Sequence, residues 1–161
     1  MDINTSVVLD GVCKSVLEEL AFLFCESQDA STFEYSHIHE AHEASMMFTG
    51  PVHGKLEIAT GQGLCLVIAG NMLGIEPEED AEKIKAYADD ALKEALNVLC
   101  GRFLTEAYGV EAVFNLSAPV IGTLNDLSLV DELAESECML FFETDEHSFV
   151  VKLTLYKPVA A

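Results

Sequence analysis

The stretch Asp89-Asp-Ala-Leu-Lys-Glu-Ala-Leu-Asn-Val-Leu-Cys-Gly-Arg-Phe-Leu-Thr-Glu-Ala-Tyr-Gly109 is the part of the chain around which the rest is organised. At 3.6 residues per turn, its large apolar residues fall on one side of a helix, with two alanines at the margin. These residues are Leu92, Leu96, Leu99 and Phe103, with Ala88 and Ala95 beside them. The pattern predicts a long helix from about Pro77 to Tyr108, which ends at Gly109 and packs its apolar face on the core.

Polar residues form a second line on the opposite side of this helix. Steps of four, three and four residues place Asp90, Glu94, Asn97 and Gly101 within an arc of about 60°. Asparagine is a mediocre helix former, and an exposed glycine inside a helix costs about 1 kcal/mol relative to alanine. Such a line is expected where another surface must approach the helix backbone. The alternative is an ordinary solvated face.

Length and charge limit the classes of protein to which the chain can belong. Its 161 residues, 50% of them hydrophobic, fit a single domain over residues 1–161. With 28 acidic and 8 basic residues, the formal net charge is −20. Nucleic acid is therefore not an expected partner, because binding phosphates requires clustered lysine and arginine. An anionic membrane surface is not expected for the same reason.

The cysteines and the N-terminus indicate a reducing compartment. Five cysteines are scattered along the chain without a Cys-x-x-Cys pair, which argues against a disulfide framework and against a zinc site built from thiolates. Residues 1–8 lack the basic and apolar regions of a secretory signal. The longest apolar run, Leu64–Ala69, is too short to span a bilayer. We therefore expect a cytoplasmic protein.

The order of the predicted elements indicates the fold class. Periodicity and turn residues predict a first helix, two strands, two helices, and then at least three strands, with a possible short helical turn before the last two. The predicted ranges are Asn4–Glu26, Ala44–Thr49, His53–Thr60, Gln62–Gly74, Pro77–Tyr108, Val110–Leu116, Leu129–Ala134, Cys138–Thr144 and Phe149–Tyr156. This order predicts an α+β domain, with a mainly antiparallel sheet and helices packed on it.

Details of the strands support two further expectations. In His53–Thr60, Leu56 and Ile58 alternate with Lys55 and Glu57, which predicts one buried and one solvated face. The pattern Pro51-Val-x-Gly-x-Leu56 recurs as Pro119-Val-x-Gly-x-Leu124 and hints at an internal duplication.

Three histidines, His37, His39 and His42, are the only metal-binding pattern that the sequence suggests. On a strand, His37 and His39 would share a face, and imidazoles so placed can bind a transition metal. Metal sites usually draw ligands from several elements, and neither a thiolate nor a fourth ligand is evident nearby. We therefore interpret this segment as a polar strand edge or loop and assign no metal ligand, with a chelating surface or a metal-responsive module as the alternative.

The polar line resembles the active-site motif of the CheC/CheX family of phosphatases, which act on the phosphorylated response regulator CheY. The family pattern is Asp or Ser, three residues, Glu, two residues, Asn and, about 22 residues later, Pro. Here it reads Asp90-x3-Glu94-x2-Asn97, followed by Pro119 after 21 intervening residues, and Gly101 matches the family glycine. The segments Phe48–Leu56 and Ala69–Gly74 also resemble the family, so the likeness extends from about Ser45 to Gly122.

The resemblance favours the CheX type, which has a single active site. The CheC type carries a second copy of the motif on its first helix. In this chain the corresponding register reads Lys14-x3-Glu18-x2-Ala21, which lacks the asparagine. The resemblance therefore implies one functional copy, on the central helix.

The resemblance also implies a role for each residue of the motif. Asn97 would enter the regulator's active site and orient the attacking water, and Glu94 would pair with the regulator's active-site lysine. Asp90, Gly101 and Pro119 would contact the partner or shape the surface that meets it. The chain would need no cofactor of its own, because the Mg²⁺ that stabilises the phosphoryl group would belong to the regulator.

The expected partners are a phosphorylated CheY-like receiver domain and a second copy of the chain. CheX-like proteins are typically dimers, and a free edge of Phe149–Tyr156 would offer a strand for pairing. The competing interpretation is a non-enzymatic receiver-binding or dimerisation module on the same scaffold, because the chain also resembles flagellar switch modules.

Overall fold

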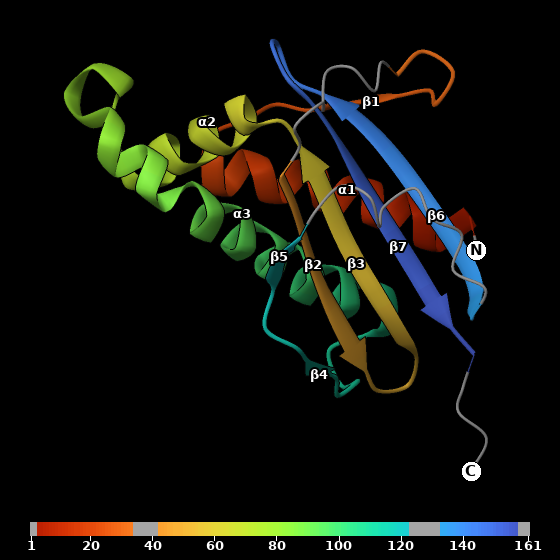
Figure 1. Cartoon of the computed structure of the whole chain (residues 1–161). Helices are drawn as coiled ribbons and strands as arrows, with labels where there is room; N and C mark the ends of the chain where they lie inside the picture. Colours follow the sequence, from red (N-terminus) through yellow and green to blue (C-terminus); the bar gives the residue numbers. More distant parts are fainter. Residues whose placement is uncertain (1–2, 34–41, 123–132, 158–161) are drawn as a thin grey trace.

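The computed structural model describes residues 3–33, 42–122 and 133–157. In this part of the chain, three helices and a seven-stranded, antiparallel sheet form an α+β fold (Figure 1). The elements are α1 (Ile3–Ala21), β1 (Glu26–Gln28), β2 (His42–Thr49), β3 (His53–Thr60), α2 (Gln62–Leu73), α3 (Pro77–Tyr108), β4 (Asn115–Leu116), β5 (Val120–Gly122), β6 (Ala134–Glu143) and β7 (Ser148–Tyr156). The predicted fold class is confirmed.

The sheet has the strand order β1-β6-β7-β3-β2-β4, and β5 also pairs with β2. The strand β7 therefore lies between β6 and β3, and the prediction that it has a free edge is wrong. Its alternating residues pack on both faces of the sheet, so it occupies an interior position. At one end of the sheet, β1 pairs only with residues 141–143 of β6, so residues 134–140 of β6 lie beyond this pairing.

The helices cover one face of the sheet, where most of the core lies (Figure 1). The helix α1 contributes Val12, Val16 and Leu17, all at most 1% exposed. The strands supply every second residue, such as Ile58 and Val151, which are paired across β3 and β7. Because a strand alternates its faces, the residues between them point to the opposite side.

In β7 and in the second half of β3 that opposite side is also buried, which corrects the expectation of a solvated face. Glu57 is only 2% exposed and Lys152, its cross-strand partner, is 4% exposed. Charged side chains are buried only when they are paired. The ammonium Nζ of Lys55 lies 2.9 Å from Oε1 of Glu57, and Nζ of Lys152 lies 3.4 Å from Oε1 of Glu137.

Other boundaries also differ from the predictions. The helix α1 ends at Ala21 rather than Glu26, because Phe22 adopts a positive φ of 55° and the chain then enters β1. Only Asn115 and Leu116 of the predicted strand Val110–Leu116 pair, and Val110 is 85% exposed. The strand β6 begins at Ala134, so this residue is not helical; Leu133 lies in a turn, and residues 129–132 of the predicted helical turn lie outside the described residues.

The two segments of the proposed internal repeat both lead into strands that pair with β2. Gly54 of the first segment lies in β3 and Gly122 of the second ends β5, and both strands run antiparallel to β2. The two copies thus occupy similar places on either side of one strand. The duplication itself stays a prediction, and Leu124 lies outside the described residues.

Candidate functional site

The site is built on α3, whose bounds match those predicted from the sequence, although the helix is kinked at Asp80, where the backbone is not helical (φ −160°, ψ 80°). Pro77 occupies the first turn, and the amide of Gly109, at φ 94°, donates to the carbonyl of Thr105 at the other end. The whole predicted apolar face is buried: Leu92, Leu96, Leu99 and Phe103 are 0% exposed, Ala95 is 0% and Ala88 is 5% exposed. Because this face is fixed on the core, the orientation of the opposite face is fixed as well.

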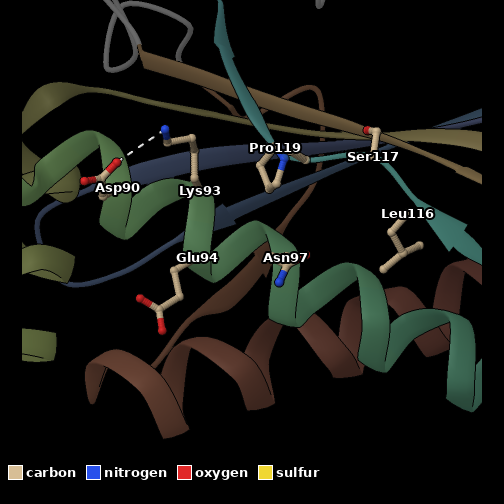
Figure 2. A pocket seen from close by; sticks show the side chains of 8 residues that line it. Asp90, Lys93, Glu94, Asn97, Leu116, Ser117 and Pro119 are labelled. Atoms are coloured by element: carbon tan, nitrogen blue, oxygen red, sulfur yellow. Dashed lines mark ion pairs between the residues drawn. The ribbon is translucent and has the colours of Figure 1, made fainter.

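On that opposite face, Asp90, Glu94 and Asn97 are all exposed, as predicted. They line a groove of about 660 Å³ together with Lys93 of α3 and residues of the β4–β5 connection. The residues of the connection are Leu116, Ser117, Ala118 and Pro119. Figure 2 shows Asp90, Glu94 and Asn97 following one another along α3, with Pro119, Ser117 and Leu116 across the groove. The tertiary structure thus brings Pro119 to the side chains with which the motif associates it.

The strand β2 holds the β4–β5 connection in place. The amide of Met47 donates to Oγ of Ser117 at 2.8 Å, and the amide of Ser117 donates to the carbonyl of Met47 at 2.9 Å. On either side of these bonds, Leu116 pairs with Phe48, and Val120 pairs with Ser45. Pro119 lies between the two pairings, where the absence of an amide hydrogen costs nothing, as a proline at an edge or turn should.

Two further side chains of α3 complete the polar surface and were not singled out from the sequence. Nζ of Lys93 lies 3.3 Å from Oδ1 of Asp90, and the hydroxyl of Tyr87 donates to Oε2 of Glu94 at 2.7 Å. The spacing of three residues between Asp90 and Lys93 and of seven between Tyr87 and Glu94 places each pair on one side of the helix. This spacing is a signal that the sequence does contain.

The environment of Tyr87 favours its protonated form. The hydrogen bond to Glu94 is the largest cause that raises the pKa of Tyr87 above its usual value, followed by partial burial and by the charges of Glu94 and Asp90. The phenol therefore remains a hydrogen-bond donor throughout the neutral pH range.

Gly101 continues the polar line but does not line the groove. It is partly exposed, and a Cβ atom added to it would meet nothing within 4 Å. The hydroxyl of Thr105 donates to its carbonyl at 3.0 Å, and the backbone at Gly101 is helical. The glycine leaves open space beside the helix, and no contact among the described residues requires it.

The register on α1 that corresponds to a second motif does not form a second site. Ala21, where the asparagine would stand, is 0% exposed and lies in the core. Its carbonyl accepts a hydrogen bond from Nδ2 of Asn71 at 2.6 Å. Glu18 is exposed, and Lys14 pairs with Asp10 at 2.9 Å.

The described residues contain no group of three or more His, Cys, Asp or Glu side chains placed to hold a metal ion. His37 and His39 lie outside the described residues. Nδ1 of His42 lies 3.1 Å from Oδ1 of Asp89, one residue before the polar line. Among the helices in the described ranges, none is long and apolar enough to cross a membrane.

Solved structures show that this arrangement is the α+β fold of CheC-like and CheX-like proteins. The CheX-CheY-BeF3-Mg²⁺ complex from Borrelia burgdorferi matches with a TM-score of 0.72 and 15% identity, over 97% of this chain and 100% of the other. The chemotaxis protein CheX from Vibrio vulnificus matches with a TM-score of 0.69 and 19% identity, over 94% and 95%. A CheC-like superfamily protein from Shewanella matches with a TM-score of 0.64 and 13% identity, over 98% and 100%.

The sequence itself identifies the family. Residues 43–143, more than half of the chain, match the model of the family described as chemotaxis phosphatase CheX. The chain therefore belongs to the CheX family, as its motif and segments suggested. The matched range contains the whole groove, from Asp90 to Pro119. No curated protein sequence matches this chain.

Proposed function

We propose that this protein is a phosphatase that hydrolyses the phosphoaspartate of a CheY-like response regulator in chemotaxis or related two-component signalling. The observation that carries the proposal is the groove itself, in which Glu94 and Asn97 are exposed one turn apart on α3 and line the same groove as Pro119. A groove open to solvent at a helix surface suits a macromolecular substrate, because its reactive group can reach the side chains only if they project outward.

Asn97 is the residue to which we assign the chemistry. Hydrolysis of an acyl phosphate requires a water placed in line with the phosphorus, together with tolerance of charge on the equatorial oxygens. A carboxamide both donates to and accepts from water, and it adds no negative charge beside the phosphoryl group. In a protein with a net charge of −20, this neutrality matters, because another carboxylate would repel the dianionic substrate.

Glu94 is the residue to which we assign the docking of the partner. Its carboxylate lies one turn before Asn97 and would pair with the active-site lysine of the regulator, which fixes the register of α3 in the regulator's active site. Asp90, with its side chain 66% exposed, would be a peripheral contact, and Pro119 would shape the facing wall. Gly101 would leave room for the partner's backbone beyond the groove.

The chemistry that we propose needs no cofactor from this chain. The Borrelia burgdorferi CheX structure is a complex with CheY, BeF3 and Mg²⁺. By analogy, we place the Mg²⁺ that neutralises the phosphoryl oxygens on the regulator, and the phosphatase contributes the water-orienting amide.

The test is the decay of a phosphorylated receiver with and without the protein, using Asn97→Ala and Asn97→Asp. We expect both variants to abolish acceleration, because alanine removes the amide and an ionised aspartate cannot donate a hydrogen bond. Glu106→Ala, at an exposed position farther along α3, is the matched control and should retain full activity. If Asn97→Ala accelerates decay as fast as wild type, the assignment is wrong.

The alternative is a receiver-binding or dimerisation module without catalytic activity on the same scaffold. The intact pair of Glu94 and Asn97 favours the enzyme, because an adaptor would not require the amide. The same decay assay distinguishes the two, since an adaptor would bind the phosphorylated receiver and leave its lifetime unchanged.

We also propose that the protein forms a homodimer in the cytoplasm, by analogy with CheX-like proteins. The interior position of β7 excludes this strand as the pairing edge. Light scattering on the purified 161-residue chain would test the dimer, and a monomer at micromolar concentration would contradict it.

A further inference from the structure

Tyr87 is hydrogen-bonded to Glu94, although Tyr87 lies outside the motif. The two residues are separated by two turns of α3, about 10.5 Å along the helix axis. The hydroxyl of Tyr87 donates to Oε2 of Glu94 at 2.7 Å across this distance. Helical side chains lean toward the N-terminal end of their helix, so Glu94 extends naturally toward Tyr87.

We propose that Tyr87 is a positioning residue that holds the Glu94 carboxylate in the orientation in which it receives the partner's cationic side chain. This inference rests on the proposed function, because it assumes that Glu94 docks the receiver. Without such a bond, a glutamate on an exposed helix face samples many rotamers. Binding of a partner must then restrict the side chain to one rotamer, and this loss of conformational entropy lowers the affinity. The bond to Tyr87 restricts the side chain in the free protein.

The geometry leaves Glu94 able to bind a partner at the same time. Only Oε2 contacts Tyr87, and a carboxylate offers two oxygens with about four acceptor sites. Figure 2 shows the Glu94 carboxylate extending away from Pro119, at the outer margin of the groove. A lysine that approaches from solvent can therefore reach Oε1 without displacing the phenol.

The neighbouring charges explain why Glu94 needs such a contact. Asp90 lies four residues before Glu94, and like charges at this spacing repel each other across one helical turn. Lys93 lies 3.3 Å from Asp90 and offsets part of this repulsion. The phenol of Tyr87 contributes a neutral donor on the other side, where a second lysine would compete with the partner's lysine for the Glu94 carboxylate. Its raised pKa keeps this donor protonated.

The experiment measures KM and kcat for dephosphorylation of the receiver by Tyr87→Phe, which removes only the hydroxyl. We expect KM to rise about two- to tenfold with kcat unchanged, the size of effect expected when one flexible side chain must be ordered on binding. Tyr108→Phe is the matched control, because Tyr108 is a partly buried tyrosine near the far end of α3, and it should leave both parameters unchanged.

A double-mutant cycle separates this inference from the proposed function. In a Glu94→Ala background, Tyr87→Phe should have no further effect on KM, because the bond is already lost. An unchanged KM for Tyr87→Phe overturns the positioning role, and so does an equal effect in both backgrounds. A lower KM also overturns it, since the phenol would then compete with the partner. If Glu94→Ala retains full activity, the proposed docking role of Glu94 fails, and the inference fails with it.

Discussion

Replacing Gly101 with alanine tests whether the polar line of α3 gives up stability to admit a partner. Gly101 lies inside α3, and a Cβ atom there would meet nothing within 4 Å among the described residues. Alanine should therefore stabilise the fold by about 1 kcal/mol through helix propensity alone. For a chain of this size, that gain corresponds to a rise in Tm of about 2–4 °C.

A second glycine of the protein provides the control. Gly11 is an exposed glycine in α1, and a Cβ atom added to it also meets nothing within 4 Å. Gly11→Ala should raise Tm by a similar amount, because the same propensity term applies. If Gly101 admits the partner's backbone, only Gly101→Ala should also raise KM for receiver dephosphorylation.

Thermal unfolding followed by circular dichroism and the phosphatase assay together decide the question. A gain in stability for both variants with a raised KM for Gly101→Ala alone would support the reasoning. A loss of stability in Gly101→Ala would refute the argument from local structure. Equal stability gains with KM unchanged in both variants would refute the functional argument and leave Gly101 as a position without a role in binding.

Three further predictions concern the same helices. Asn97→Ala should lose activity but keep Tm or raise it by about 1–2 °C. The Tm should not fall because an exposed asparagine is replaced by a better helix former, and a clear drop in Tm would contradict this. Ala21→Asn should not create a second active site. It should lower the free energy of unfolding by about 1–3 kcal/mol, because it places an amide in the core. Urea denaturation measures this change, and an unchanged free energy of unfolding would contradict the prediction. The hydrogen bond to Glu94 raises the pKa of Tyr87 above its usual value of 10.0. The stability that this hydrogen bond contributes is therefore present below pH 10 and is lost as the pH rises through the higher pKa of the folded state. A difference titration of tyrosinate absorbance between wild type and Tyr87→Phe checks this, and ionisation of Tyr87 below pH 10 would contradict it.

Local signals in the sequence predicted the elements whose limits are local. The bounds of α3 follow from Pro77 at its start and Gly109 at its end, and α2 ends where Gly74 adopts a left-handed conformation with φ 69°. The hairpin between β2 and β3 follows from the turn at Gly50 and Pro51. Each of these signals acts within one turn of the backbone, so no distant contact is needed to interpret it.

Apart from the end of α1, which is set by the local conformation of Phe22, the failed predictions depend on distant neighbours. The apolar pattern of β7 does not say whether another strand pairs on each side, and the structure places it between β6 and β3. The alternation of apolar and charged residues in β3 predicted a solvent-exposed face, but Glu57 is buried where it pairs with Lys152 of β7. Likewise, valine is a residue type favoured in strands, but Val110 lies in a turn and pairs with no strand in the described part of the chain. Pairing is decided between segments far apart in the chain, and propensity alone does not reveal it.

The sequence by itself determined the family, the helix that carries the site, and the spacing that places Glu94 and Asn97 on one exposed face. The helical period is enough for this, because it relates residues within a single element. Only the tertiary structure decided that Pro119 faces Asn97 across a groove and that Ala21 is buried. The first depends on the pairing of the β4–β5 connection with β2, and the second depends on the packing of α1 in the core. The hydrogen bond from Tyr87 to Glu94 depends on both the sequence and the tertiary structure. The spacing of the two residues permits the bond, and the orientation of α3 leaves it exposed beside the groove.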